Sequence, residues 1–294
     1  MHKYLRAVGF SSLKGRKMLQ RLLADTVVNA DRQDVVIDQD NVLLGEFCKD
    51  FAQNMGVAVC GEFDENHKFI YEYYYPYLNG EGITSYEDVS VERHADKESY
   101  AGVCDDVKVG ISLIFYLKNR IPYIRAQAAD MLPVRGTTLT LSALSVAGTI
   151  LYPIQKDQEQ IERVKRDSAT RSTLMAAARK GDEDAIETLT LEDMDMYTTI
   201  SKRIQKEDVF TLVDTYFMPY GVECDQYSVL GEIQNIRITT NMMTGEKIYI
   251  LTICSNELTF DVSINIIDLF GEPQVGRRFK GVIWLQGKVN FPEE

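Results

Sequence analysis

The sequence predicts an α+β protein in three parts: an antiparallel-sheet α+β domain over residues 1–155, a helical connector over 156–220 and a small OB-like β-barrel over 221–294. Apolar and polar residues alternate through most of the first part, which indicates strands. Residues 155–206, which make up most of the connector, are rich in helix-forming residues and lack proline, and five short strand-like runs fill the last part. A length of 294 residues also fits about two domains of roughly 100–200 residues each.

The first domain is predicted to begin with an amphipathic helix of about 15 residues. Leu19, Leu22 and Leu23 recur at helical spacing, and Ser11 and Ser12 offer capping hydroxyls before them. We expect strands over 57–63, 69–77, 109–117 and 139–146, and a second helix within 43–55. Short turns over 64–67 and 118–120 make neighbouring strands antiparallel, with the first helix covering one face of the sheet.

The connector is predicted to be helical over 155–206. Ser172 would cap a short helix that ends at Gly181, and the acidic residues 182–184 would start the next helix, where the helix dipole favours negative charge. Thr190 followed by Asp193 resembles a capping box before a further helix. These charged residues are therefore interpreted as helix boundaries.

The barrel is predicted from five strands, over 228–240, 247–254, 258–264, 279–285 and 288–291. The break at 265–270 has room for one short helix, at the position where an OB-type barrel places one. An SH3-like barrel and an open antiparallel sheet remain alternatives to the OB-like topology.

Composition and charge narrow the classes of partner and compartment. The chain has 32 Lys and Arg against 44 Asp and Glu, a net charge of −12 that disfavours polyanionic partners. The uncharged run over 136–155 is long enough to cross a bilayer, but its many hydroxyl side chains favour two short buried strands. The five cysteines of the chain include no CxxC pair, and no signal peptide is recognisable. We therefore expect a cytoplasmic protein with reduced thiols and no membrane partner.

No complete catalytic, cofactor or metal motif is present. The segment 9–17 has the wrong spacing for a phosphate-binding loop. Cys60 and His67 are the one close Cys–His pair, but they meet poorly across the predicted hairpin. The carboxylate clusters at 105–106 and 192–195 are explained by solvation and helix capping rather than by a metal ion. The sequence therefore predicts no catalytic residue, no metal site and no cofactor.

An aromatic strand is the most unusual local feature. Side chains alternate across a strand, so every second residue of 69–77 is expected to project from one face as a single aromatic stripe. Such a stripe can stack bases or sugars, or it can form the core face under the first helix. In the barrel, a basic spot lies beside an aromatic residue. The candidate ligand-binding residues are Tyr71, Tyr73, Tyr75, Arg277, Arg278 and Trp284.

Three segments carry a resemblance to a known family: MHKYLRAVGF at 1–10, YFMPYGVECD at 216–225 and YSVLGEI at 227–233. Over its whole length the chain resembles an uncharacterised bacterial domain-of-unknown-function family from Gram-positive anaerobes. The resemblance implies a cytoplasmic bacterial protein and brings no activity, cofactor or catalytic residue.

The leading expectation is a non-catalytic cytosolic binding or assembly protein, with a protein or a small ligand as its partner. One alternative is an enzyme whose dispersed site lies in the cleft between the domains. The other is single-stranded nucleic-acid binding by the barrel, which the excess of acidic over basic residues in 216–294 disfavours.

Overall fold

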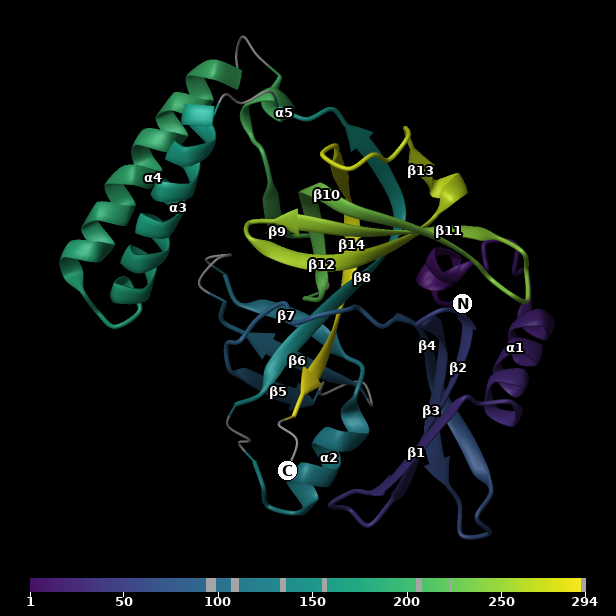
Figure 1. The fold of residues 1–294 in the computed structure, drawn as a ribbon. Helices are drawn as coiled ribbons and strands as arrows, with labels where there is room; N and C mark the ends of the chain where they lie inside the picture. The colour runs from purple at the N-terminus through teal and green to yellow at the C-terminus, as the bar shows by residue number, and fades with distance from the viewer. Residues whose placement is uncertain are drawn as a thin grey trace.

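A computed structural model describes residues 1–93, 99–106, 111–132, 136–154, 158–204, 208–222 and 224–291. Figure 1 shows a four-stranded sheet below, a β-barrel above it and a helical hairpin that stands to one side. The predicted fold class is confirmed: the protein is α+β, with an N-terminal antiparallel sheet, a helical connector and a small closed barrel.

The four-stranded sheet is antiparallel throughout. The predicted helix over 43–55 is wrong, because this segment is a strand whose residues are mostly buried on both faces. A strand covered on both faces loses its alternation, and its apolar residues can then imitate helical spacing. In spatial order the strands are β1 (Arg32–Ile37), β2 (Leu43–Ala52), β3 (Met55–Phe63) and β4 (Phe69–Leu78).

The first helix, α1 (Arg16–Val28), packs its leucines into the core beside β2 and β3, as predicted. Its predicted serine cap is wrong. Gly15 occupies the N-cap position, and the backbone N–H groups of Ser11 and Ser12 instead donate to the carboxylate of Glu246, each at 3.0 Å. The helix is therefore anchored to the barrel by the turn that precedes it.

The aromatic residues of β4 do not form a single stripe. Tyr73 pairs with Cys60 and Tyr71 pairs with Gly61, so the residue between the two tyrosines is an extra one, a β-bulge. Because Cys60 and Gly61 are consecutive on β3, Tyr73 and Tyr71 lie on opposite faces of the sheet. The bulge thus separates the tyrosines that the alternation placed together.

The barrel is closed by five strands in the order β8–β12–β11–β10–β14, with β14 returning to pair with β8. One pair, β12 with β8, is parallel, and the other four are antiparallel. This is an OB-like order in which the strand that ordinarily ends the chain comes first. The strands are β8 (Thr138–Leu151), β10 (Gln226–Thr240), β11 (Lys247–Ser255), β12 (Leu258–Asn265) and β14 (Arg278–Asn290).

Two of the predicted barrel strands, 279–285 and 288–291, are one continuous strand, β14. The fifth strand is β8, which the predicted division assigns to the first domain and splits in two. Its pairing with β12 and β14 completes the barrel. The predicted break at 265–270 holds the short helix η2 (Ile266–Asp268) and β13 (Leu269–Phe270).

Three further strands extend the barrel sheet from β14 in the order β7–β6–β5, so β5 is the terminal strand. The predicted turn over 118–120 is wrong because a helix begins at Arg120. The strand predicted over 109–117 begins at Leu113 in the structure, and residues 109–110 lie outside the described residues. These elements are β5 (Val89–Arg93), β6 (Tyr100–Cys104), β7 (Leu113–Leu117) and α2 (Arg120–Ala128).

The connector is an antiparallel hairpin of α3 (Gln158–Ala178) and α4 (Glu183–Ile204), inserted between barrel strands β8 and β10 (Figure 1). Helix α4 begins at the acidic residues as predicted. The predicted caps at Ser172 and Thr190 are wrong, since both residues lie inside helices. The short α5 (Val209–Leu212) and β9 (Tyr216–Pro219), which pairs with β10, follow the hairpin.

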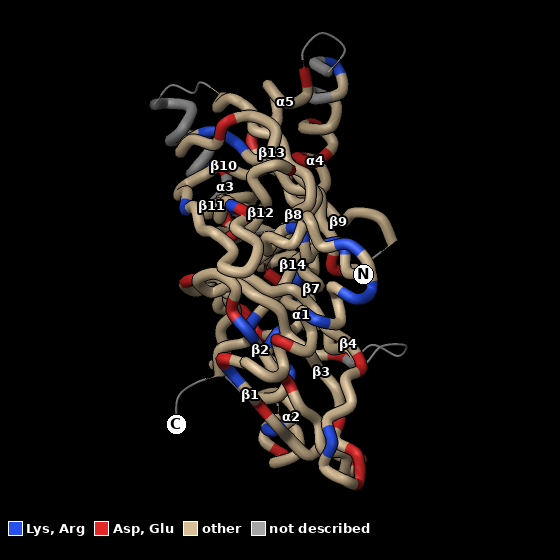
Figure 2. The backbone as a smooth tube through the Cα atoms, turned by 90° about the vertical axis from the view of Figure 1, so that its right-hand side faces the viewer, with Lys and Arg blue, Asp and Glu red and all other residues tan. Residues whose placement is uncertain are grey.

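Acidic and basic residues are interspersed along the backbone (Figure 2).

The N-terminal 3₁₀ helix η1 (Lys3–Val8) packs against β4 of the sheet and against barrel strands β8 and β12. Side chains of the barrel bind its last carbonyl groups: Asn241 Nδ2 donates to Val8 O at 2.8 Å and Ser263 Oγ donates to Ala7 O at 2.5 Å. Gly9 follows with φ of 86°, and a Cβ built there would stand 2.6 Å from Asn241 Cβ.

This close approach gives a testable prediction for Gly9→Ala. Gly181, which follows α3, also has a positive φ, of 87°, but no atom within 4 Å of a built Cβ, so Gly181→Ala is a control for backbone strain alone. We expect Gly9→Ala to lower the free energy of unfolding by about 1–3 kcal/mol more than Gly181→Ala, because it adds overpacking to the backbone strain. Urea denaturation of both variants measures the difference, and equal losses would contradict the packing.

Candidate functional site

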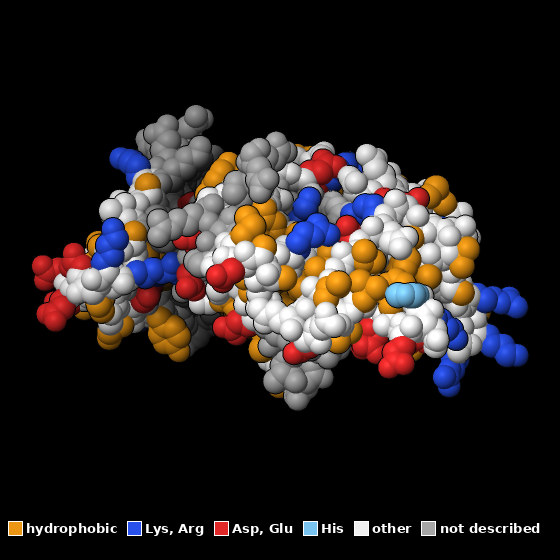
Figure 3. All heavy atoms as spheres, turned by 90° about the horizontal axis from the view of Figure 1, so that it is seen from below, with side chains coloured by type: hydrophobic (Ala, Val, Ile, Leu, Met, Phe, Trp, Pro, Cys, Tyr) orange, Lys and Arg blue, Asp and Glu red, His pale blue; other side chains and the backbone are white. Residues whose placement is uncertain are grey.

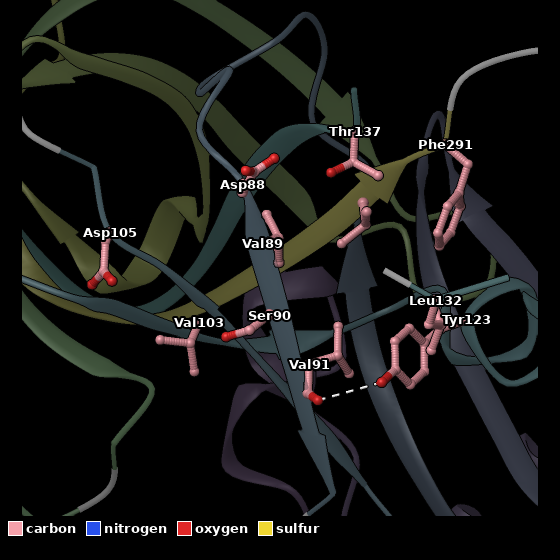
Figure 4. Close-up of a pocket in the computed structure, with 11 residues that line it drawn as sticks. Asp88, Val89, Ser90, Val91, Val103, Asp105, Tyr123, Leu132, Thr137 and Phe291 are labelled. Atoms are coloured by element: carbon pink, nitrogen blue, oxygen red, sulfur yellow. Dashed lines mark hydrogen bonds between the residues drawn. The ribbon is translucent and has the colours of Figure 1, made fainter. Parts of the chain in front are cut away.

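A pocket of about 610 Å³ lies beside the terminal strand β5. Figure 4 shows Val89 and Val91 of β5 on one side of it, with Tyr123 of α2, Leu132 and Phe291 across from them. The volume is typical of a small-ligand site. The apolar part of its lining is Val89, Val91, Val103, Leu132, Val289 and Phe291.

The polar part of the lining is acidic. It has the carboxylates of Asp88 and Asp105 and hydroxyl groups from a serine, a threonine and Tyr123, and no Lys or Arg among the described lining residues. Asp105 accepts a hydrogen bond from Ser112 Oγ. The Tyr123 hydroxyl donates to Val91 O at 3.4 Å, and burial raises the pKa of this phenol. The Arg179 guanidinium donates to the backbone carbonyl of Asp105 at 2.8 Å but is not itself among the lining residues. The lining therefore offers hydrogen-bond acceptors and negative charge above an apolar wall.

A second hollow of about 190 Å³ adjoins the first, because Val91 and Tyr123 line both. Its outer rim is the turn between β1 and β2, with Asp38 and Asp40. Asp38 Oδ1 accepts the backbone N–H groups of Asp40 and Val42 at 3.0 and 2.9 Å, which holds the turn in place. The two hollows follow the same strand, one toward each end.

Packing of distant segments holds these walls in position. In α2, Ile121 and Ile124 are buried with Val36 and Leu44 of the four-stranded sheet, which orients Tyr123 toward β5. Under β5, the ring of Phe115 lies where a Cβ on Gly102 would stand, at 2.1 Å. Only glycine allows β6 to approach that ring so closely.

A separate polar cluster is buried between the four-stranded sheet and α2. Glu46 Oε2 lies 3.4 Å from Cys60 Sγ, 3.4 Å from Tyr75 Oη and 3.8 Å from Arg120 Nε. Burial raises the pKa of Glu46, while Arg120 lowers it. Burial likewise raises the pKa of Cys60 well above its usual range. A protonated, enclosed thiol is a poor nucleophile, so this cluster is structural.

Lys118 continues this polar layer toward the barrel. Its side chain is 7% exposed and donates to Leu78 O and, at 2.9 Å, to Ser142 Oγ. Burial lowers the pKa of Lys118 to about 7. Because it joins β4 to β8, the ammonium group links the four-stranded sheet to the barrel.

The predicted aromatic residues are divided among different surroundings. Tyr75 is buried and its ring lies 4.8 Å from that of Tyr116, which lies 5.1 Å from Trp284. The Trp284 Nε1–H donates to Asp225 at 2.7 Å. These rings form part of the core between sheet and barrel. None of them lines either hollow.

Tyr73 and Tyr71 differ in solvent exposure because they lie on opposite faces of the sheet. Tyr73 is half-buried, with the Arg120 guanidinium 5.2 Å from its ring centroid. Tyr71 is 52% exposed near the far end of the sheet. Val35 and Ile37 are also exposed on this sheet, and Figure 3 shows hydrophobic side chains gathered on the lower face of the molecule.

The predicted arginines lie at the opposite end of the molecule from Tyr71. Arg278 is buried and its guanidinium donates to four backbone carbonyl groups, those of Tyr152, Phe210, Val213 and Asp214. Arg277 donates to Glu272 O and stands 5.1 Å from the Tyr152 ring centroid. Arg278 therefore fixes the end of the connector to the barrel. The structure does not bring the six predicted residues together.

The outer face of β11 and β12 is covered by the chain itself. In OB-type barrels the second and third strands carry the ligand-binding face, and β11 and β12 hold those positions here. Ser263 and Asn265 of β12 donate to Ala7 O and Arg6 O of η1. Ile250, opposite Ser263, is 5% exposed. The N-terminal segment thus occupies this face.

The structure also bears on the Cys–His pair, on metal sites and on membrane-spanning helices. Cys60 is buried on β3, while His67 stands in the exposed turn that follows the strand. Within the described ranges, no group of three or more His, Cys, Asp or Glu is arranged to hold a metal ion. No helix in those ranges combines the length and apolar character needed to cross a membrane.

The sequence did not indicate the pocket because β5 and β6, which with the residues next to them carry about half of its lining, were not predicted, although Val289 and Phe291 lie in the predicted strand 288–291. Of the acidic lining residues, the sequence singles out Asp105, as part of a carboxylate pair. The alternation of Val89, Ser90 and Val91 was a usable strand signal. The opposite wall comes from α2 and from the end of β14, about 35 and 200 residues away along the chain, and no local pattern relates them to β5.

Residues 5–287 match the family described as "Domain of unknown function, E. rectale Gene description (DUF3881)". The match covers nearly the whole chain, so the protein belongs to this family, and the resemblance to an uncharacterised family is confirmed. A search of curated proteins and a search of solved structures each found no match. The family description names no activity.

Proposed function

We propose that this is a non-catalytic binding protein and that the pocket beside β5 is its ligand site. The ligand would have an apolar body and at least one positively charged group. The observation that supports this is the lining itself: an apolar wall next to the carboxylates of Asp88 and Asp105, with no cation among the described lining residues.

Charge and burial would act together in such a site. Apolar surface contributes about 25 cal/mol for each Å² removed from water. A cation beside either carboxylate gains Coulomb energy that increases as water is displaced from the pocket. A carboxylate ligand of the same shape would meet repulsion instead. The charge of the ligand, rather than its shape, is therefore the property to test.

The experiment compares linear alkyl amines with alkyl carboxylates of equal chain length, by thermal shift and calorimetry. We expect amines to raise the melting temperature and carboxylates to leave it unchanged. The double variant Asp88→Asn/Asp105→Asn should lose at least about tenfold in amine affinity, since charged contacts contribute about 1.5–3 kcal/mol each. Glu232→Gln, an equivalent change of an exposed carboxylate on β10, is the control.

Equal binding of amines and carboxylates, or equal loss in the Glu232→Gln control, would overturn the assignment of the pocket. Amine binding to the wild-type protein that is unchanged at high salt would also contradict it, because screening should weaken a charge-based contact.

The proposal includes a cytoplasmic location. Cys48, Cys60 and Cys104 are buried as free thiols, which is typical of proteins in reducing compartments. Fractionation of cells that express the full chain tests this location, and recovery in the exported fraction would contradict it.

A further inference from the structure

Strand β5 presents its backbone to the two hollows, which together are called the groove. Among the described residues β5 is the last strand of its sheet, and β6 is its one described neighbour. The carbonyl of Val91 points away from β6 toward Tyr123, whose hydroxyl is its partner at 3.4 Å (Figure 4). In an antiparallel pair the N–H and C=O of one residue point to the same side. The amide N–H of Val91 therefore also faces the groove.

The two hollows lie along this strand and share Val91 and Tyr123, which are joined by the hydrogen bond between them. The larger includes Asp88, Val89, Ser90 and Val91 in its lining, and the smaller begins at Val91. Five strand residues span about 17 Å at about 3.4 Å per residue. A linear ligand fits this shape better than a compact one.

The charges lie at both ends of the groove. Asp88 and Asp105 line the larger hollow, and Asp38 and Asp40 line the smaller one. Between them the shared wall is Val91 and Tyr123. Along the direction of β5, the described lining is thus acidic at one end, apolar in the middle and acidic at the other end.

We propose that the ligand is an extended peptide that pairs with β5 as an added strand, with basic side chains near its two ends and apolar side chains between them. This rests on the proposed function, since it names the class of ligand that the pocket takes. Backbone hydrogen bonds to the edge supply affinity once the Tyr123 hydroxyl yields Val91 O to the incoming strand, and the alternate side chains supply specificity. The two acidic ends select a peptide with positive charge at both ends.

The probe is a capped heptapeptide with lysine at positions one and seven, valine at three and five, and threonine elsewhere. One face of this strand then reads basic, apolar, apolar, basic. Two further versions carry backbone N-methyl groups, one at the even positions and one at the odd positions. Since alternate amides point to opposite sides of a strand, only one version blocks pairing with β5. We expect that version to bind at least about tenfold more weakly and the other to keep its affinity.

A protein variant tests the same contact from the other side. Val91→Pro removes an N–H that faces the groove without removing a β5–β6 hydrogen bond, as edge strands tolerate. Val91→Ala shortens the same side chain and keeps the N–H, so it is the matched control. Because Val91→Ala also removes part of the apolar wall, the N–H is measured by the difference between the two variants: we expect Val91→Pro to weaken peptide binding by at least about tenfold more than Val91→Ala does, while circular dichroism shows that both remain folded.

The outcomes separate the two proposals. If the amines bind but both N-methylated peptides bind equally, the added strand is overturned and the pocket proposal stands. If neither amines nor peptides bind, both are overturned. If the chain instead self-associates and Val91→Pro abolishes this, a second copy rather than a basic peptide occupies the edge, which also overturns the inference.

Discussion

Replacing Arg120 by leucine is expected to lower the free energy of unfolding by about 3–5 kcal/mol, because it leaves the carboxylate of Glu46 buried without its cation. Arg120 is 3% exposed and Glu46 is 8% exposed, so water cannot replace the lost partner. Chemical denaturation at neutral pH measures this loss.

The pH dependence of the same variant gives a second readout. Burial already raises the pKa of Glu46. An acid whose pKa is higher in the folded state binds protons more tightly there, so its burial costs less as the pH falls. Arg120→Leu should therefore lose less stability at pH 5 than at pH 8.

A double variant provides the control for Arg120→Leu. Glu46→Gln keeps an acceptor for Cys60 and Tyr75 but removes the charge, so Glu46→Gln/Arg120→Leu should recover at least half of the loss. If Arg120→Leu alone costs less than about 1 kcal/mol, the value of an exposed pair, the buried ion pair is not formed as described.

Lys118 is expected to make stability rise with pH. Its pKa is lowered to about 7 in the folded protein, whereas an unfolded lysine titrates near 10.4. Between these values the unfolded chain holds one more proton, so the free energy of unfolding increases by about 1.4 kcal/mol per pH unit, or about 4 kcal/mol from pH 7 to 10. Denaturation of wild type and Lys118→Met across this range measures it.

The difference between the two proteins isolates Lys118, because the buried tyrosines and cysteines are common to both. That difference should grow with pH and reach a plateau above pH 10. Lys247→Met, which removes an exposed lysine of β11, should follow wild type at every pH. A difference that stays constant with pH would show that Lys118 is not a buried ammonium.

Local sequence was sufficient where neighbours along the chain decide the structure. The turn at 64–67 folds as predicted, with the Asp64 N–H donating to Lys68 O at 3.0 Å. The amphipathic α1 and the strands β10, β11 and β12 also lie close to their predicted ranges. Periodicity reports which side of an element is buried, and this was enough to place them.

The same rule failed where burial was not one-sided. Strand β2 is covered on both faces, so its pattern imitated a helix. In β4 one extra residue reversed the alternation between Tyr71 and Tyr73; the local mark of this bulge is Gly61 on the neighbouring strand, where a built Cβ would stand 2.0 Å from Ile70 O. Side-chain period cannot reveal either effect, because both arise from what packs against the strand.

The sequence by itself determined the α+β class, the strands β10, β11, β12 and β14 that the barrel takes from the end of the chain, the family and the lack of a recognisable catalytic motif. Only the tertiary structure decided that β8 closes the barrel and that η1 covers the outer face of β11 and β12. It alone brought α2 and the end of β14 to the edge of β5 to make an acidic groove. The local residue pattern determines which residues are buried. Pairing between segments far apart in the sequence determines which residues they pack against, and a site built from such segments depends on that pairing.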